Sequence, residues 1–546
     1  RRHAAGIAVA LLLAVMLVGP RWWLLATDPP EGERVQLSPW GAGTFGYDQS
    51  LYTPNIRQAF DGRWSIADLY AFGDDRAPIQ TGGIWMQAIG LLGRATGDIF
   101  SSLALVTTIA AIAAFLLFYA MGVTLTRSRF AAIAAMPIAL LCVQAVTQTD
   151  TIIGLRHWSI LKPVVLGDPG LDFHAWARFI APILPLPLFF GAAIAVPFGV
   201  ETGRRGWIAA GVICMTLLVY TYAFYWTSAA FALAAWLGWL LLRRDVERAR
   251  RLAIIGSLTA LLALPELAGT AWNTFTLTHD MRARVGAGTP APDDIPSWSN
   301  IVARFAVGVP FLAGCLRGPE RNRLYITFFL APLILVRAPL DVPQPFHYTL
   351  QVWPAFAIPA VLAGGHEIWR VLPNRGRQLA TAVLAVAALA GSAQYIAVQL
   401  RATNNVDDAF AIRADEHAAF DWIDGHLGRD AVIVTPSITT NMYIAALSRS
   451  PKYIRDGFDF IARTPDGRDA RPSDDEIVDR YLRTQVAYGF GEETTFARID
   501  PIYRCEQPGD YRCNPPTSNF PFKDISPDLR EREAALETNM AYYLLN

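Results

Sequence analysis

The stretch SSLALVTTIAAIAAFLLFYAMGV at 101–123 contains no charged residue and is long enough to cross a membrane as a helix. A bilayer core about 30 Å thick requires roughly 17–25 predominantly apolar residues in a helix. Similar apolar runs recur through residues 1–400, whereas residues 401–546 are polar. Only 17% of the chain is charged and 53% is hydrophobic, against about 25% charged residues in an average soluble domain. The sequence therefore predicts a polytopic α-helical membrane protein.

We predict about eleven transmembrane helices from the length of these apolar runs. They are expected at 5–26, 101–123, 130–146, 178–199, 207–227, 229–242, 252–270, 300–316, 323–338, 351–369 and 379–398. The first run continues through Trp22 and Trp23, so we expect a retained helix rather than a signal peptide. The predicted domains are a transmembrane domain, 1–400, with a long first outward loop at 27–100, and a soluble extracytoplasmic α/β domain, 401–546.

Arginine collects in alternate short connections between the predicted helices, and this pattern predicts their orientation. The clusters are Arg1/Arg2, Arg127/Arg129, Arg204/Arg205, Arg243 to Arg251, Arg317/Arg321/Arg323 and Arg370/Arg375/Arg377. Placing all of them in the cytoplasm satisfies the positive-inside rule. With an odd number of spans, the N-terminus is then cytoplasmic and the C-terminal domain lies outside. The longer connections 147–177, 271–299 and 339–350 also face outward.

The cysteines and the overall charge indicate the compartment of the protein and the partners that it does not favour. Cys142, Cys214 and Cys315 fall in or beside apolar runs and are expected to be packing residues. Cys505 and Cys513 form either a disulfide, which needs an oxidising compartment, or a free pair. A net charge of zero gives no electrostatic case for nucleic acid. The usage of Ala, Arg and Gly favours a bacterial source, so we predict the inner (plasma) membrane as the location.

The first outward loop contains an aspartate, Asp48, set among aromatic residues in the string YDQSLY. The segment NIRQAFDGRW follows, and its apolar residues recur at helical spacing. They are Ile56, Phe60 and Trp64. We expect this helix to lie in the interface plane with Asp48 just before it. Because a carboxylate there is costly unless it is functional or paired, Asp48 is either a functional group, a helix cap or a partner of Arg57.

This layout resembles the GT-C superfamily of membrane glycosyltransferases, which includes oligosaccharyltransferases, protein mannosyltransferases and aminoarabinose transferases. The resemblance rests on YDQSLY, on the long first outward loop between the first and second helices, and on the outward C-terminal domain. A second point is EHAAFDWIDGHLGRDAVIVTP at 416–436. It predicts a helix with Phe420, Ile423 and Leu427 on one face, followed by a strand at 431–435. The resemblance implies a polyprenyl-phosphate-linked sugar donor and an acidic catalytic residue in the first loop.

On this resemblance, Asp48 is the candidate base, with Asp74 and Asp75 of GDDRAP as further catalytic candidates. Asp74 or Asp75 either assists Asp48, binds a divalent cation or belongs to an ordinary turn. No other cofactor is indicated, and the sequence contains no zinc signature, P-loop or G-x-G-x-x-G motif.

Basic residues of the outward loops are candidates for binding the donor phosphate. They are Arg76, His174, Arg178, Arg337 and His347. In DFHAWARF, His174 and Arg178 are four residues apart and would share one face of a helix. An arginine at this depth either binds a phosphate bidentately or extends toward ordinary lipid headgroups.

The sequence thus favours an integral membrane glycosyltransferase that moves a sugar from a polyprenyl-phosphate donor to a glycan, lipid or protein acceptor of the cell envelope. Its other expected partners are membrane lipids. Two alternatives remain open: a transporter or flippase of lipid-linked saccharides, and a catalytically silent envelope-assembly protein. The transporter would require polar residues along the spans, and most of the predicted spans are almost uniformly apolar.

Overall fold

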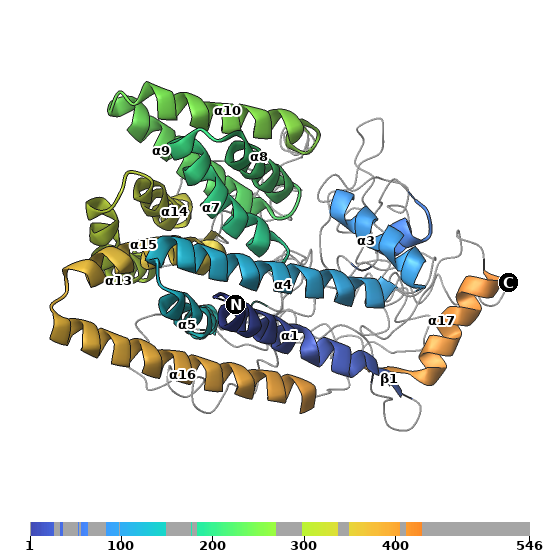
Figure 1. Cartoon of the computed structure of the whole chain (residues 1–546). Coiled ribbons are helices and arrows are strands. Elements are labelled where there is room, and N and C mark those ends of the chain that lie inside the picture. The colour runs from blue at the N-terminus through green and yellow to red at the C-terminus, as the bar shows by residue number, and fades with distance from the viewer. Residues whose placement is uncertain are drawn as a thin grey trace, which may run out of the picture. The chain divides into compact units, whose positions relative to one another are not determined.

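The computed structural model describes residues 2–26, 33–35, 53, 56–63, 83–97, 99–148, 176, 183–268, 298–336, 349–404 and 411–427 (Figure 1). The chain divides into two compact units. Unit 1 comprises residues 1–26, 104–269 and 290–406, and unit 2 comprises residues 27–103, 270–289 and 407–546. The first outward loop therefore groups with the C-terminal part of the chain. The predicted division into 1–400 and 401–546 stays a prediction.

Each of the eleven predicted apolar stretches overlaps a helix. These helices are α1 (Ala4–Ala26), α4 (Ile99–Thr126), α5 (Arg129–Gln148), α7 (Pro185–Thr202), α8 (Arg205–Val219), α9 (Ala223–Leu242), α10 (Val246–Leu262), α13 (Trp298–Arg317), α14 (Asn322–Leu335), α15 (Thr349–Val371) and α16 (Asn374–Asn404). Among the described residues, four helices are long and apolar enough to cross a membrane, namely α4, α7, α9 and the part of α16 at Asn374–Ala397. The number of helices that do cross stays a prediction.

Several predicted boundaries were wrong. α7 begins at Pro185 instead of residue 178, because the prolines of APILPLPL lack the N–H that a helix interior needs, and Pro185 suits the first helical position. α8 ends at Val219 and α9 begins at Ala223, so the turn lies before residue 228, inside a continuous apolar run. α10 begins at Val246 because the Asp245 carboxylate accepts a hydrogen bond from the backbone N–H of Arg248 and caps the helix.

The largest fully buried side chains of unit 1 are aromatic. Phe189 of α7 stacks on Phe356 of α15, with ring centroids 4.1 Å apart. Phe328 of α14 and Tyr225 of α9 pack against the same pair. These buried rings join four helices that are distant in sequence, and burial of such large apolar side chains dominates core energetics.

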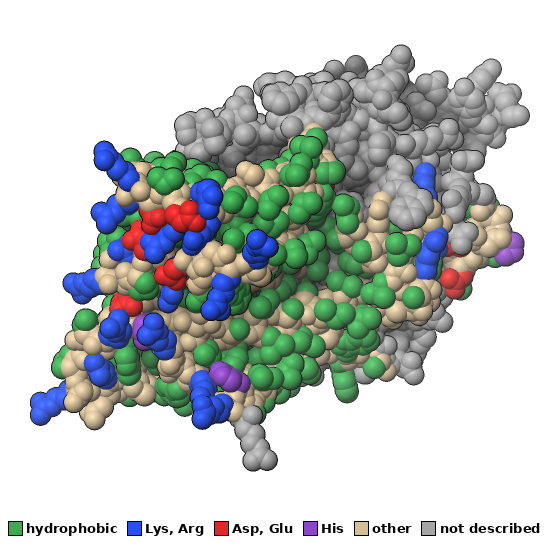
Figure 2. All heavy atoms as spheres, turned by 45° about the horizontal axis from the view of Figure 1, so that its top comes forward, with side chains coloured by type: hydrophobic (Ala, Val, Ile, Leu, Met, Phe, Trp, Pro, Cys, Tyr) green, Lys and Arg blue, Asp and Glu red, His purple; other side chains and the backbone are tan. Residues whose placement is uncertain are grey.

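Charged side chains gather at one end of the described part of unit 1, while hydrophobic side chains cover much of the remaining described face in view (Figure 2). Several predicted arginine clusters contact one another or neighbouring connections there. Arg129 donates to the backbone carbonyl of Arg2, and Arg321 pairs with Glu201 at 2.7 Å. Trp239 donates to Glu320 at 2.6 Å. These contacts support the grouping of the clusters on one side of a membrane; the cytoplasmic orientation stays a prediction.

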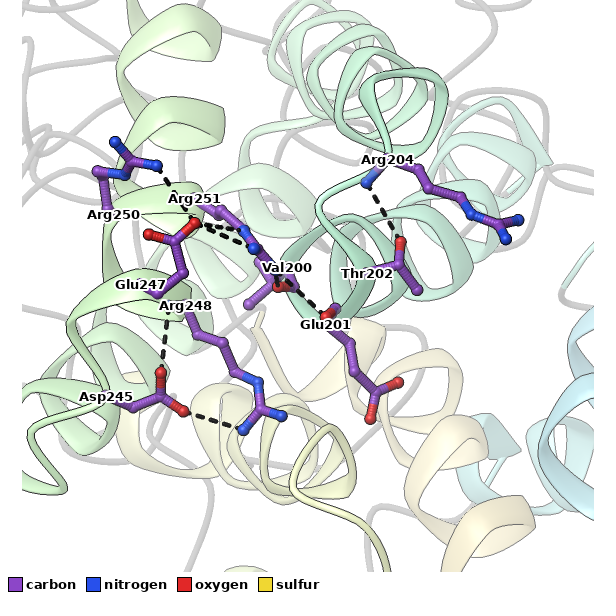
Figure 3. Close-up of polar contacts among 9 residues, drawn as sticks. All are labelled: Val200, Glu201, Thr202, Arg204, Asp245, Glu247, Arg248, Arg250 and Arg251. Atoms are coloured by element: carbon purple, nitrogen blue, oxygen red, sulfur yellow. Dashed lines mark hydrogen bonds and ion pairs between the residues drawn. The ribbon is translucent and has the colours of Figure 1, made fainter.

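Arg251 shows how these contacts provide hydrogen-bond donors for the unpaired backbone carbonyls at a helix end (Figure 3). Its guanidinium donates to the carbonyls of Val200 and Glu201 at 3.0 and 3.3 Å, and it pairs with Glu247 at 3.0 Å. The last carbonyls of a helix have no partner within that helix. Arg251 of α10 therefore supplies donors to the end of α7.

The described cysteines, Cys142, Cys214 and Cys315, are free. Cys315 is buried and its thiol donates to the carbonyl of Ala360, as expected of a packing residue. Cys142 is exposed and Cys214 is half-buried, so their interpretation as packing residues stays a prediction. Cys505 and Cys513 lie outside the described residues.

Within unit 2 the structure describes α3 (Gly83–Thr96), α17 (Ala414–His426) and two short strands, β1 (Glu33–Val35) and β2 (Ala411–Arg413). α17 confirms the predicted helix, with Phe420 buried and Ile423 half-buried, whereas Leu427 is exposed. The predicted strand at 431–435 lies outside the described residues. The α/β character of the C-terminal domain stays a prediction.

Candidate functional site

All eight residues predicted for the site lie outside the described residues. They are Asp48, Asp74, Asp75, Arg76, His174, Arg178, Arg337 and His347. Their roles therefore stay predictions. The contacts below are those of described residues near them in the sequence.

The helical segment after Asp48 packs against α3. Ile56 and Ala59 are buried, and the backbone of this segment approaches Gly90 closely. A Cβ at Gly90 would lie 2.5 Å from the Ala59 Cβ and 2.6 Å from the Ile56 carbonyl oxygen, so the contact requires glycine. Arg94 of α3 donates from Nε to the carbonyl of Phe60. The face expected to lie on the membrane interface thus buries Ile56 against protein, with Phe60 half-buried.

Arg57 lies between two carboxylates of unit 2. Its Nε is 3.2 Å from Oδ2 of Asp61, and its Nη2 is 2.5 Å from Oδ2 of Asp424 in α17. The side chains of Arg57, Asp61 and Asp424 are only 15%, 7% and 18% exposed. The guanidinium also lies 5.5 Å from the ring centroid of Phe60. A residue of the first outward loop is therefore bonded directly to the C-terminal part of the chain.

Trp176 lies between His174 and Arg178 in the sequence and is buried in unit 1. Its ring centroid is 6.1 Å from that of Phe115, 6.5 Å from that of Phe118 and 6.3 Å from that of Phe190. Phe115 and Phe118 belong to interior turns of α4, so Trp176 packs among the helices rather than on a loop outside them.

Arg304 is a candidate that the sequence analysis missed. It lies in α13 and is only 4% exposed, and its guanidinium carbon is 5.7 Å from the ring centroid of Trp353 in α15. The indole N–H of Trp353 is buried without a hydrogen-bond partner in the described structure. α13 overlaps one of the predicted spans, and a buried arginine in a membrane helix is by default a candidate functional residue. The sequence feature that could have identified Arg304 is its position as a single arginine within the otherwise apolar run 300–316.

Described parts of the chain hold no group of three or more His, Cys, Asp or Glu side chains that could bind a metal ion. Asp74 and Asp75 lie outside those parts, so the divalent cation stays a prediction.

Comparison with known proteins gives structural likenesses only. No family model and no curated protein matches the sequence. The crystal structure of ArnT from Cupriavidus metallidurans bound to undecaprenyl phosphate is similar with a TM-score of 0.46 and 15% identity, over 82% of this chain and 85% of that chain. The archaeal oligosaccharyltransferase AglB from Archaeoglobus fulgidus, in complex with an inhibitory peptide and a dolichol-phosphate, is similar with a TM-score of 0.46 and 11% identity.

The AglB match covers 84% of this chain and 65% of AglB, so it spans just under two thirds of that enzyme. Both proteins are membrane glycosyltransferases of the GT-C superfamily, the superfamily that the sequence resembles. At this TM-score and identity, the likeness carries no argument about substrate, site or mechanism.

Proposed function

We propose that this protein is a GT-C-type glycosyltransferase that transfers a sugar from a polyprenyl-phosphate donor to an envelope acceptor at the outer face of the bacterial inner membrane. The observation that carries the proposal is the first outward loop. It places an aspartate among aromatic residues, in YDQSLY, between α1 and a succession of apolar helices. Its described part is also bonded to the C-terminal part of the chain through Arg57.

In this mechanism Asp48 is the general base. An acceptor hydroxyl oxygen attacks the anomeric carbon, the bond from that carbon to the phosphate oxygen breaks, and the hydroxyl proton passes to the Asp48 carboxylate. Polyprenyl phosphate leaves with the bonding electron pair. Asp74 or Asp75 assists Asp48 or holds a divalent cation, which would stabilise charge on the departing phosphate.

The departing phosphate needs hydrogen-bond donors and positive charge. The proposed donors are Arg76, His174, Arg178, Arg337 and His347. Arg304 and Trp353 join this set for a structural reason. They combine a buried guanidinium with a buried indole N–H that a phosphate oxygen could accept from. Trp353 lies in the first turns of α15, shortly after His347 in the sequence.

The decisive experiment is native mass spectrometry of the protein purified from membranes, as wild type and as Asp48→Asn. We expect sugar-bearing polyprenyl phosphate to bind both forms, and to be consumed only by the wild type when envelope acceptors are supplied. Asn keeps the shape of Asp48 but cannot take the proton. Equal consumption by both forms would disprove the role of Asp48 as base.

The same measurement separates the alternatives. Binding of the sugar lipid without consumption by either form would favour a transporter or flippase. The absence of any bound lipid would favour an assembly protein without catalytic activity.

A further inference from the structure

Three connections between helices are bonded to one another at the charged end of unit 1, namely α7–α8, α9–α10 and α13–α14. Arg251, near the start of α10, donates to the carbonyl of Glu201 at the end of α7. The Glu201 carboxylate in turn pairs with Arg321 of the α13–α14 connection. Trp239, near the end of α9, donates to Glu320 of that same connection. The three connections therefore form one surface.

The carboxylates of this surface already have basic partners. The ion pairs are Glu201–Arg321, Asp245–Arg248, Glu247–Arg250, Glu247–Arg251 and Glu320–Arg323. Every carboxylate among the described residues of these connections is therefore engaged, and none is left to neutralise further positive charge.

Five further arginines of the same connections have no acidic partner in the part of the chain that the structure describes. All of them are exposed, and they are Arg204, Arg205, Arg243, Arg244 and Arg317. In Figure 3 the guanidinium of Arg204 makes no contact with the carboxylates drawn, and only its backbone N–H is bonded, to Oγ1 of Thr202. Because arginine keeps its positive charge in proteins, this surface carries a surplus of positive charge.

Exposed apolar side chains lie beside these arginines in the sequence. They are Trp207, Leu241, Leu242, Val246 and Leu316. Leu242, which is 83% exposed, directly precedes Arg243, and Trp207 lies two residues after Arg205. Tryptophan is enriched where a membrane meets water. A soluble anion would use only the arginines, whereas an amphiphile with a negative head group would use both kinds of side chain.

We propose that this surface binds anionic phospholipids. The phosphate groups bind at the pairs Arg204–Arg205 and Arg243–Arg244, and the acyl chains lie along the exposed apolar side chains beside them. A guanidinium can bond two phosphate oxygens at once. Each basic residue near an anionic membrane surface contributes about fivefold in affinity. This binding is independent of the proposed function, because the lipid is not a substrate.

The experiment is native mass spectrometry of the full-length protein in detergent, titrated with dioleoyl phosphatidylglycerol or with dioleoyl phosphatidylcholine. The two lipids have the same acyl chains, but only the first has a net negative charge. We expect the wild type to bind phosphatidylglycerol about tenfold more tightly, and high salt to reduce this preference. Arg204→Gln/Arg205→Gln and Arg243→Gln/Arg244→Gln should each lower the preference by about fivefold or more.

Two further variants make the result specific. Arg243→Lys/Arg244→Lys keeps both charges and should retain most of the preference. Arg127→Gln/Arg375→Gln is the matched control, because it removes two exposed arginines from other connections of unit 1. The neighbours of these two, Arg129 and Arg377, donate to backbone carbonyls, so neither position offers an adjacent pair of unbonded guanidinium groups. The control should therefore leave the preference nearly unchanged.

Equal binding of the two lipids by the wild type would overturn the proposal, and so would a preference that survives in both Gln double variants. An equal loss in Arg127→Gln/Arg375→Gln would overturn the placement, because the effect would then follow the overall charge. Displacement of the bound lipid by inorganic phosphate at comparable concentration would show that the phosphate alone is recognised, and would overturn the lipid as occupant. Should a Gln variant not fold, the Lys variant and the salt dependence of the wild type decide: a preference that high salt leaves unchanged would overturn the proposal.

Discussion

The charged end of unit 1 and the interior of the same unit both contain arginine, but they accommodate it differently. At the charged end, Arg251 and Arg323 donate to carbonyls at helix ends, where unpaired acceptors are available in any case. In the interior, Arg304 lies against the ring of Trp353 and is only 4% exposed. An arginine beside water loses little hydration, whereas a buried one needs specific compensation. We therefore expect burial, rather than the number of contacts, to decide how much each arginine contributes to stability.

The largest effect is expected from Arg304→Gln. Loss of the buried cation–π contact with Trp353 should lower the free energy of unfolding in detergent by about 2 kcal/mol. Arg304→Gln should also weaken binding of added undecaprenyl phosphate, measured by native mass spectrometry. Arg317→Gln, an exposed position at the charged end of the same helix, is the control and should change neither quantity. Equal losses of stability and of lipid binding at both positions would show that the buried Arg304 is no more important than the exposed Arg317.

Arg304 also shows what sequence reasoning could and could not find. The helices were predictable because each apolar run carries its own length and composition. The arginines were interpreted as clusters in the connections, and a single arginine inside an apolar run does not alter such a pattern. Its importance depends on Trp353, a residue of another helix, and no local pattern reports that contact.

The site itself was less accessible to sequence reasoning for the same reason. Asp48 lies outside the described residues, so its pairing with Arg57 stays a prediction. The structure pairs Arg57 with Asp424, 367 residues away, which no local pattern predicts. Trp176 lies within the connection 147–177, and its contacts with the rings of α4 and α7 were not predicted from the sequence. Helical periodicity predicts which face of a segment is apolar, but it does not identify the residues that pack against that face.

An intermediate effect is expected from Arg321→Ala. This substitution compares a half-buried ion pair with an exposed one, both at the charged end of unit 1. The Arg321 and Glu201 side chains are 17% and 26% exposed, and Arg321 also lies 5.0 Å from the ring centroid of Phe198. We expect a loss of about 1 kcal/mol in the free energy of unfolding, because the pair is partly solvated. Arg250→Ala is the control, since Arg250 and Glu247 are 67% and 53% exposed. If Arg250→Ala lowered the free energy of unfolding as much as Arg321→Ala, the contribution of these ion pairs would not depend on their burial.

The smallest effect is expected from titration of Glu247, at the start of α10. A side-chain hydrogen bond from Arg250 is the main cause that lowers the pKa of this carboxyl below its ordinary 4.5, and Arg251 adds to it. A carboxyl whose pKa is lowered by folding stabilises the fold above its unfolded pKa, and this contribution disappears as the pH falls through the folded pKa. The thermal midpoint of the wild type should therefore show a small decrease below pH 4.5 that Glu247→Gln lacks. Because this carboxylate is solvated, high salt should reduce the difference between the two curves. Identical acid profiles for both proteins at low salt would mean that Arg250 and Arg251 hold Glu247 too weakly to matter, even though the ion pairs are formed.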